Sequence, residues 1–499
     1  MNVVVGKTAD APDFPVAAKI ALKNDQLRRN VRNATDIIRA RRAIRVEEMP
    51  DWEDLRQTAN DIKDHTLAHL DHYLVQFEQN VERAGGKVHW ARDAGEANAI
   101  ALGLIRQYSV DGQPAEVIKV KTMTSDEIQL NVALEHAGIT PYETDLADMI
   151  VQMGNEEPSH IIVPALHKNR FEVREIFREK MNLPDLGDQP VDLANAARHY
   201  LREKFLRIKI GVSGVNFGVA DSGTICVVES EGNGRMCITM PDVLISLMGI
   251  EKLVPTWQDL EVFLQLLPRS ATGERMNPYN SFWTGVTPGD GPKHFHLILL
   301  DNGRTNQLHD ERERETLNCI RCGACLNVCP VYRETGGHAY GSIYSGPIGA
   351  ILTPQLLSLD HSRSLPYASS LCGACYEVCP VKINIPETLI HLRGKIVRED
   401  QKTFTGALSV ENIAMQAIAK IFLSHRRYEA AQRLARVGQL VFKRKGQLAH
   451  LPGMAGEWTK FRDLRPVPNY SFRDWWKKRG HDAATKDSAT KDSATKEVR

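Results

Sequence analysis

The most informative stretch of this chain is Cys319-Ile-Arg-Cys322-Gly-Ala-Cys325-Leu-Asn-Val-Cys329-Pro330. It has the C-x2-C-x2-C-x3-C-P spacing of bacterial-type ferredoxins. The corner irons of a cubane lie close together, and two-residue gaps let three thiolates of one tight loop reach three of them. Gly323 relieves crowding where the backbone approaches the cluster, and Pro330 turns the chain away so that Cys329 faces a different cluster.

A second motif nearly repeats the first: Ser369-Ser370-Leu371-Cys372-Gly373-Ala374-Cys375-Tyr376-Glu377-Val378-Cys379-Pro380. In duplicated sites of this kind, the fourth cysteine of each motif ligates the other cluster. The sequence therefore predicts two iron–sulfur clusters, both of the [4Fe-4S] type. The ligands assigned to cluster 1 are Cys319, Cys322, Cys325 and Cys379, and those assigned to cluster 2 are Cys329, Cys372 and Cys375.

One position departs from the repeat, because Ser369 stands where the register of the first motif requires a cysteine. Cluster 2 then has three thiolates from this chain. Its fourth iron could take the Ser369 oxygen, a ligand from a partner, or water, or it could be absent, as in a [3Fe-4S] cluster. An open iron would be a Lewis acid able to bind a hydroxy-acid. The spacing does not decide among these possibilities.

The alternative to iron–sulfur chemistry is a tetrahedral zinc site, built from paired CxxC units and closed by four ligands. The proline-ended spacing of four cysteines, present nearly twice, argues against zinc. Seven of the nine cysteines fall in this one segment, which excludes a disulfide scaffold and favours metal chemistry in a reducing compartment.

Composition narrows the class of protein further. The length of 499 residues predicts two to four domains. The 63 basic residues are balanced by 62 acidic ones, which argues against a nucleic-acid binder acting through bulk charge. The amino terminus has no secretory signal pattern, and no stretch approaches the ~18 apolar residues that a membrane span needs. We therefore expect a cytoplasmic protein.

Composition and the spacing of apolar residues divide the chain into five regions. Residues 1–85 are expected to be helical with a break at Pro50, and the arginines from Arg28 to Arg45 are interpreted as a solvated helix face. Residues 86–303 alternate strand-like and helix-like stretches, which indicates an α/β domain with a largely parallel sheet. Residues 304–400 carry the cysteines, 401–480 are helical and basic, and 481–499 form a small polar tail that we expect to be disordered.

Seven stretches of the α/β region, rich in Val and Ile, are predicted to be strands. They are KVHWA, EVIKVK, HIIVPAL, KIGVSGVNFGVA, GTICVVES, RMCITM and HFHLILL. Cys226 and Cys237 lie in two of them and are expected to be small buried side chains.

A glycine-dense stretch, residues 211–236, could cradle an anion with Asn216, Asp221, Ser222 and Thr224, although tight turns need glycine anyway. It lacks the G-x-G-x-x-G fingerprint, so we expect no NAD, and no flavin motif is visible. Residues 414–445 combine arginines and lysines with apolar positions. They could dock on an acidic partner or at a membrane surface, or pack a core with a solvated basic side.

The sequence resembles the lactate utilization protein B family, the iron–sulfur subunit of L-lactate oxidation. The resemblance covers nearly the whole chain. It rests on KTMTSDEIQLNVALEHAGITPYETDLADMIVQMG, on GVNFGVADSGTICVVESEGNGRM with ITMPDVLISLMGIEKLVPT, and on NCIRCGACLNVCPVYR with SSLCGACYEVCPVKINIP. Its central part is similar to the LUD domain, whose α/β fold is related to sugar-phosphate isomerases and CoA transferases. Its cysteine part is similar to helical ferredoxin domains, and Ser369 agrees with the family.

The resemblance implies an electron-transfer subunit that oxidises L-lactate to pyruvate together with a cysteine-rich iron–sulfur protein and a smaller LUD-domain protein. It leaves the electron acceptor unknown. A rival interpretation is a catalytic subunit that binds a hydroxy-acid at the α/β domain or at an open cluster iron, with Asn216 to Thr224 as the candidate stretch. A third interpretation is a redox sensor. It is disfavoured because no DNA-binding element is recognised in the sequence.

Overall fold

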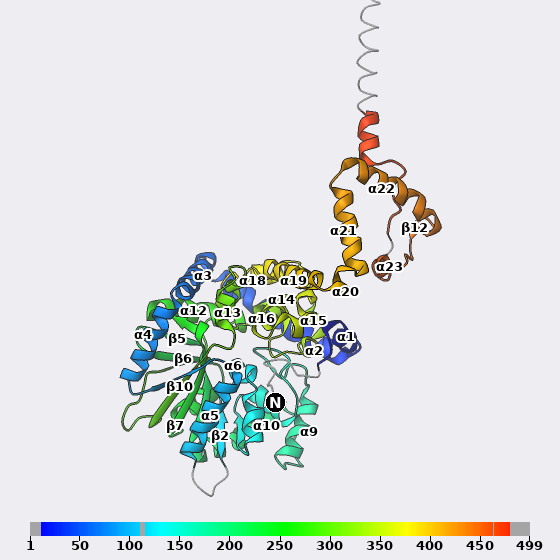
Figure 1. Ribbon diagram of the computed structural model, residues 1–499. Helices are drawn as coiled ribbons and strands as arrows, with labels where there is room; N and C mark the ends of the chain where they lie inside the picture. Colours follow the sequence, from blue (N-terminus) through cyan, green and yellow to red (C-terminus); the bar gives the residue numbers. More distant parts are fainter. Residues whose placement is uncertain (1–10, 110–114, 463, 480–499) are drawn as a thin grey trace, which may run out of the picture. The chain divides into compact units, whose positions relative to one another are not determined.

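The computed structural model describes residues 11–109, 115–462 and 464–479 of the chain (Figure 1). The described residues up to Ile396 form one compact unit, and those from Val397 onward form another. The predicted tail, 481–499, lies outside the described residues. The domain boundaries predicted within the first unit stay predictions.

A six-stranded sheet organises the first unit, and every neighbouring pair of its strands is parallel. The strands follow the order β1-β10-β7-β4-β2-β3. Their bounds are Lys87–Ala91, His294–Leu300, Val243–Gly249, Ile210–Gly214, Glu116–Lys119 and Thr140–Glu143, in that order. The parallel α/β layer expected from the alternating texture is therefore present.

Helices cover both faces of this sheet, and the alternation of side chains along β10 shows how. Ile298 and Leu300 pack with α5 (Ala94–Tyr108) and α7 (Leu130–His136) on one face. Phe295, Leu297 and Leu299 pack with α4 (Leu70–Arg83) and α11 (Asn233–Thr239) on the other. A strand buried on both faces is a near-continuous apolar run, which is the pattern of β7 and β10.

A second sheet, β8-β5-β6-β9, was not foreseen from the sequence. Its strands are Leu253–Val254, Phe217–Val219, Thr224–Glu229 and Tyr279–Trp283. Two of its three pairings are antiparallel. It is built largely from the glycine-dense stretch, whose turns let one segment supply β4, β5 and β6 in succession.

Two of the predicted strands are wrong. RMCITM lies within α11, which begins after Gly232, a residue with a φ of 84°, and the Glu229 carboxylate accepts N–H groups from Gly232 and Arg235 at its amino end. HIIVPAL is a loop of bends and turns. The His160 ring there accepts the backbone N–H groups of Ile162 and Val163, which a strand would have given to a neighbour.

The remaining α-helices described in the α/β part lie between strands along the chain. They are α6 (Met123–Glu127), α8 (Leu146–Met153), α9 (Arg170–Lys180), α10 (Pro190–Arg207) and α12 (Trp257–Ala271). The direction in which strands are added reverses between β2 and β4, so the carboxyl ends of β2 and β3 lie beside a topological switch point, where α/β sheets place their ligands.

From residue 11 onward, where the description of the chain begins, three α-helices precede α4: α1 (Phe14–Ala21), α2 (Asp25–Glu47) and α3 (Trp52–Ala68). Pro50 lies between α2 and α3, where the sequence predicts a break. The cysteine segment is helical, and most of its helices are short. They are α13 (Arg304–Leu308), α14 (Ala324–Val328), α15 (Tyr332–Thr335), α16 (Gly346–Leu356), α17 (Leu359–Ser362), α18 (Ala374–Val378) and the longer α19 (Ile385–Lys402). Short 3-10 helices lie at Arg314–Asn318, His338–Tyr340 and Leu365–Tyr367.

The second unit contains α20 (Phe404–Ala407), α21 (Val410–Phe422), α22 (His425–Gly438), the hairpin β11 (Lys443–Arg444) and β12 (Gln447–Leu448), and α23 (Met454–Thr459). Neither α21 nor α22 buries a residue, so the expectation that this basic run packs a core is wrong for these helices. Among the described residues, no helix is long and apolar enough to cross a membrane.

Candidate iron–sulfur site

The four cysteines assigned to cluster 1 line one small cavity. Cys319, Cys322 and Cys325 come from the loop before α14 and its first turn, and Cys379 follows α18. The rest of the wall is largely apolar and is made by Ile320, Ile348, Val381, Ile383 and Ile385 together with Arg321, Gly323 and Pro380. Packing of α14 against α18 therefore brings the last cysteine of the second motif to the first three cysteines of the first motif.

The other three cysteines are also neighbours. Burial first, and then the nearby thiolates of Cys329 and Cys372, raise the pKa of Cys375 to about 12. Burial likewise raises the pKa of Cys329, and the negative charge of the Cys372 thiolate also raises it. Cys372 is exposed, whereas Cys329 and Cys375 are buried. The structure thus gathers the set assigned to cluster 2 with one member facing solvent.

The two cysteine loops share a local geometry. Gly323 and Gly373 each precede a one-turn helix and have φ values of 70° and 88°. This left-handed conformation is costly for any residue with a Cβ, so glycine is required at both places. The internal duplication seen in the letters is therefore also a duplication of backbone shape.

The chemistry of these donors fits an iron–sulfur cluster. The backbone N–H groups of Arg321, Tyr332 and Ile383 donate to the Sγ atoms of Cys319, Cys329 and Cys379 at 3.4, 3.5 and 3.4 Å. Amide donors of this kind hold thiolate ligands and tune the metal. Burial raises the pKa of the free Cys379 thiol to about 11, so metal binding must displace its proton.

Ser369 is only partly buried, and its Oγ accepts the N–H of Leu371 at 3.1 Å. The carbonyl oxygen of Ser369 accepts from Arg393 Nη2 at 3.4 Å. These contacts fix the turn before Cys372. They leave the fourth ligand of cluster 2 among the possibilities stated from the sequence.

Arginines of the amino-terminal helices contact the cysteine segment, which the sequence did not foresee. Arg28 and Arg32 of α2 both pair with Glu334. Arg42 Nη2 donates to the Val378 carbonyl at 3.0 Å. Arg28 and Arg42 are partly buried in these contacts, so the interpretation of this basic run as a solvated face is wrong for these two, whereas Arg32 is exposed as that interpretation requires. No spacing along the chain indicates such contacts, because the partners are about 300 positions apart.

A buried ion-pair network joins the sheet to the cysteine loop. Arg304 pairs with Glu127 at 2.9 Å and with Glu251 at 2.5 Å, and all three side chains are at most 1% exposed. Arg321 extends this network, because its Nη2 lies 3.3 Å from Glu251 and its guanidinium lies over the Tyr344 ring at 4.9 Å. Tyr344 Oη also donates to Glu127 at 2.5 Å.

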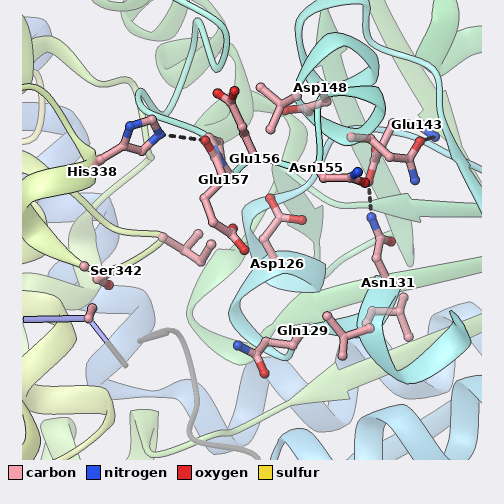
Figure 2. A pocket seen from close by; sticks show the side chains of 18 of the residues that line it. Asp126, Gln129, Asn131, Glu143, Asp148, Asn155, Glu156, Glu157, His338 and Ser342 are labelled. Carbon is pink, nitrogen blue, oxygen red and sulfur yellow. Dashed lines mark hydrogen bonds between the residues drawn. The ribbon is translucent and has the colours of Figure 1, made fainter. Parts of the chain in front are cut away.

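A second cavity, of about 670 Å3, lies at the carboxyl ends of β2 and β3. Figure 2 shows its wall, with Asp126 and Gln129 from the chain after β2, Glu143 at the end of β3, and Glu157 and His338 on the opposite side. Glu143 pairs with the buried Lys119 at 2.5 Å. No pattern in the sequence indicated this cavity, because its lining comes from segments far apart.

Carboxylates dominate this second cavity. Burial raises the pKa of Asp148 well above its usual value. Burial also raises the pKa of Glu157, and Asp126, toward which Glu157 extends in Figure 2, raises it further. Carboxylates that repel one another in this way do not suit a second anion. The cavity is therefore a poor site for the carboxylate of a hydroxy-acid.

The glycine-dense stretch uses its polar side chains internally. Asn216 Oδ1 accepts the N–H of Val228 at 2.9 Å, and Ser222 Oγ donates to Thr224 Oγ1 at 2.9 Å. The structure therefore favours the interpretation that these glycines serve tight turns. Cys226 and Cys237 are fully buried, as expected, and burial raises the pKa of Cys226 to about 12.

Comparisons with known proteins agree with this architecture. Residues 74–300 match the LUD domain, 315–383 match the 4Fe-4S dicluster domain, and 393–481 match the domain described as lactate utilisation protein B, C-terminal. A protein of Oceanobacillus iheyensis named lactate utilization protein B is 42% identical over 92% of this chain and 94% of its own. The chain belongs to the lactate utilization protein B family.

Two further relatives of the same name are similarly close. That of Bacillus licheniformis is 43% identical over 92% of this chain and 95% of its own. That of Bacillus subtilis is 41% identical over 93% of this chain and 96% of its own. As a member of the lactate utilization protein B family, the chain combines a LUD domain, built on the parallel sheet, with a 4Fe-4S dicluster domain.

Proposed function

We propose that this protein carries electrons through two iron–sulfur clusters in the oxidation of L-lactate to pyruvate, in support of growth on lactate. One observation carries the proposal: the seven clustered cysteines form two groups, four that line one small cavity and three, Cys329, Cys372 and Cys375, that are neighbours of one another. The name of the relatives supplies the substrate.

Oxidation of a hydroxy-acid to a keto-acid releases two electrons, and bound iron–sulfur clusters would supply one-electron redox chemistry. The chain's own residues would hold the clusters and shield them from water. Cys319, Cys322, Cys325 and Cys379 would hold cluster 1, and Cys329, Cys372 and Cys375 would hold cluster 2. Apolar side chains such as Ile348 and Ile383 exclude water from the first site. The exposed Cys372 leaves the second site open to a redox partner.

The partners that we propose are a cysteine-rich iron–sulfur protein and a smaller LUD-domain protein, in a cytoplasmic system whose electron acceptor is unidentified. A conduit of this kind needs no lactate site of its own. The acidic character of the large cavity supports that division of labour, because lactate is an anion.

Anaerobic EPR of the purified protein tests the proposal. Spectra are recorded as isolated, after dithionite, after L-lactate alone, and after L-lactate with the two proposed partners. We expect two reduced-cluster signals with dithionite and with the full mixture, and none with lactate alone. Signals with lactate alone would place catalysis on this chain. Zinc in place of iron, with no cluster signal in any state, would refute the proposal.

The Ser369→Cys variant separates a conduit from a catalyst that binds substrate at an open iron. A conduit should keep partner-dependent reduction by lactate when a fourth thiol is supplied. A catalyst should lose it, because the open coordination position would be filled. Iron and sulfide content, measured beside the activity, shows whether both clusters are present in the variant.

A further inference from the structure

Three arginines, of which two are buried and one is partly buried, lie beside the site of cluster 1. Arg56 of α3 is 6% exposed, and its Nε donates to the Cys379 carbonyl at 2.8 Å while its Nη2 donates to the Tyr376 carbonyl at 3.2 Å. Arg42 donates to the carbonyl of Val378, the residue before Cys379. Both guanidinium groups are therefore fixed against the main chain of one predicted ligand.

Arg321 lies on the other side of the same cavity, between Cys319 and Cys322 in sequence, and is 6% exposed. Lys63, which is 2% exposed, donates to the Glu251 carbonyl nearby. The thiolate of Cys319 is among the charges that act on Lys63 and Arg321.

These cations have only partial compensation within the protein. Arg321 shares Glu251 with Arg304, and Arg56 pairs with Glu53, whose side chain is 67% exposed. The Nε atoms of Arg42 and Arg321 are buried and have no hydrogen-bond partner among the described residues. Buried positive charge is expensive unless an anion lies close to it. Four thiolates bound to a cluster would supply that anion.

The site of cluster 2 differs from that of cluster 1 in its exposure to solvent. Its residue Cys372 is exposed, so solvent stabilises additional negative charge there. Arg393, which donates to the Ser369 carbonyl, lies over the Tyr367 ring at 5.0 Å and is only partly buried. The first site is enclosed and walled by isoleucines, and burial by itself would oppose the addition of an electron to a cluster there.

We propose that Arg42 and Arg56, with Arg321, are tuning residues that raise the reduction potential of cluster 1 selectively, so that the enclosed cluster can accept an electron from the exposed one. The inference rests on the proposed function. Reduction adds one negative charge to a cluster, and a fixed cation stabilises that charge more strongly in a buried site than in water. In the transfer, the exposed cluster loses one electron and the enclosed cluster gains it.

The test is an EPR-monitored redox titration of the whole protein with its clusters assembled anaerobically. Cys372→Ser identifies the signal of cluster 2. Arg56→Gln and Arg42→Gln remove the charge and keep a side chain that can donate a hydrogen bond. Each should lower the midpoint potential of cluster 1 and leave that of cluster 2 unchanged. Arg56→Lys, which keeps the charge, should stay close to the wild-type potential.

The matched control is Arg207→Gln, since Arg207 is 45% exposed in its side chain and pairs with Glu116 and Glu203 far along the chain from both cysteine loops. It should move neither potential. An unchanged cluster 1 potential in both glutamine variants, equal shifts of both clusters, or a shift in Arg56→Lys as large as in Arg56→Gln would overturn the inference.

Iron and sulfide analysis accompanies each titration. If Arg56→Gln cannot hold cluster 1, Arg42→Gln compared with Arg42→Lys decides the question by the same criteria. The two proposals can fail separately. Potentials that shift as expected, without any reduction by lactate and partners, would retain the tuning role and refute the lactate function. Reduction by lactate and partners, without a selective shift of the cluster 1 potential, would retain the lactate function and refute the tuning role.

Discussion

At the scale of single residues, Arg304 illustrates how charge is used inside this protein. It is 1% exposed and shares its guanidinium between Glu127 and Glu251, two carboxylates that are equally inaccessible. Burial alone would raise the pKa of Glu251, but Arg304 and Arg321 lower it to about 2. The network stays ionised because every member has a partner, and loss of one member leaves the others buried and unpaired.

We expect Arg304→Met to destabilise the protein by about 3–5 kcal/mol, because it leaves Glu127 and Glu251 as uncompensated buried charges. Urea unfolding followed by circular dichroism measures the change. Arg92→Gln is the matched control, since Arg92 is 86% exposed in its pair with Glu96 and its loss should change the stability far less. Similar losses in the two variants would contradict this account.

His296 predicts a dependence of stability on pH. Its ring lies 3.0 Å from His89 and 3.1 Å from the Tyr108 hydroxyl, and burial, followed by His89 and Lys87, lowers its pKa from 6.5 to about 4. Between these two pH values the unfolded chain binds a proton that the folded chain does not. This contribution to stability is therefore present above about pH 6.5 and is lost as the pH falls toward about 4.

The variant His296→Gln should flatten this dependence, because it removes the titrating group and keeps a polar side chain. Between about pH 7 and about pH 5 the wild type should lose about 2 kcal/mol more than the variant, at ~1.4 kcal/mol for each pH unit. Urea midpoints at the two pH values give the comparison. Parallel losses in both proteins would assign the pH effect to other groups.

At the scale of elements, the end of β4 approaches the chain after β2 so closely that only glycine fits. A Cβ on Gly214 would lie 2.1 Å from Thr122 Oγ1 and 2.4 Å from Thr122 Cβ. Thr122 is buried and caps α6 by accepting the N–H of Thr124. The contact holds together the two strands that flank the topological switch point.

Gly214→Ala should therefore destabilise the protein by about 1–3 kcal/mol, as overpacking usually does. Gly103→Ala in α5 provides the control, because a Cβ there meets nothing within 4 Å. Alanine in an exposed helical position should be neutral or stabilise by up to about 1 kcal/mol. Thermal unfolding of both variants tests the pair, and equal stability of the two would show that β4 can shift to make room.

At the scale of the whole molecule, the sheet and the cysteine loops belong to one compact unit, whereas the residues from Val397 onward form another. Within the first unit, Arg304, Glu251 and Arg321 connect the sheet to the first cysteine loop. Loss of a cluster should consequently loosen the structure at the sheet, because it removes the negative charge that faces Arg321 and Lys63.

Anaerobic removal of iron with a chelator should lower the melting temperature and raise hydrogen exchange in two places. These are residues 319–329, which lose their metal, and residues 249–254, which carry Glu251 and run from the end of β7 through β8. Exchange in residues 410–438 should change little, because they belong to the other unit. An increase confined to the cysteine loops would show that the ion pairs do not couple the two parts.

The iron–sulfur character could be predicted from the sequence alone, because ligand spacing in a ferredoxin-type loop is local and can be counted along the chain. The sequence also indicated the parallel α/β layer, whose apolar runs repeat regularly. It did not show that RMCITM is helical, because a carboxylate and a left-handed glycine start a helix there.

The charges that lie around the cysteines could be identified only from the tertiary structure. Arg42 and Arg56 lie more than 250 positions before Cys319, and packing of α2 and α3 places them against the main chain around Cys379. The acidic cavity beside β2 and β3 likewise combines segments that no local pattern relates. Burial and long-range packing determine the electrostatics of a site, and neither is a local property of the chain.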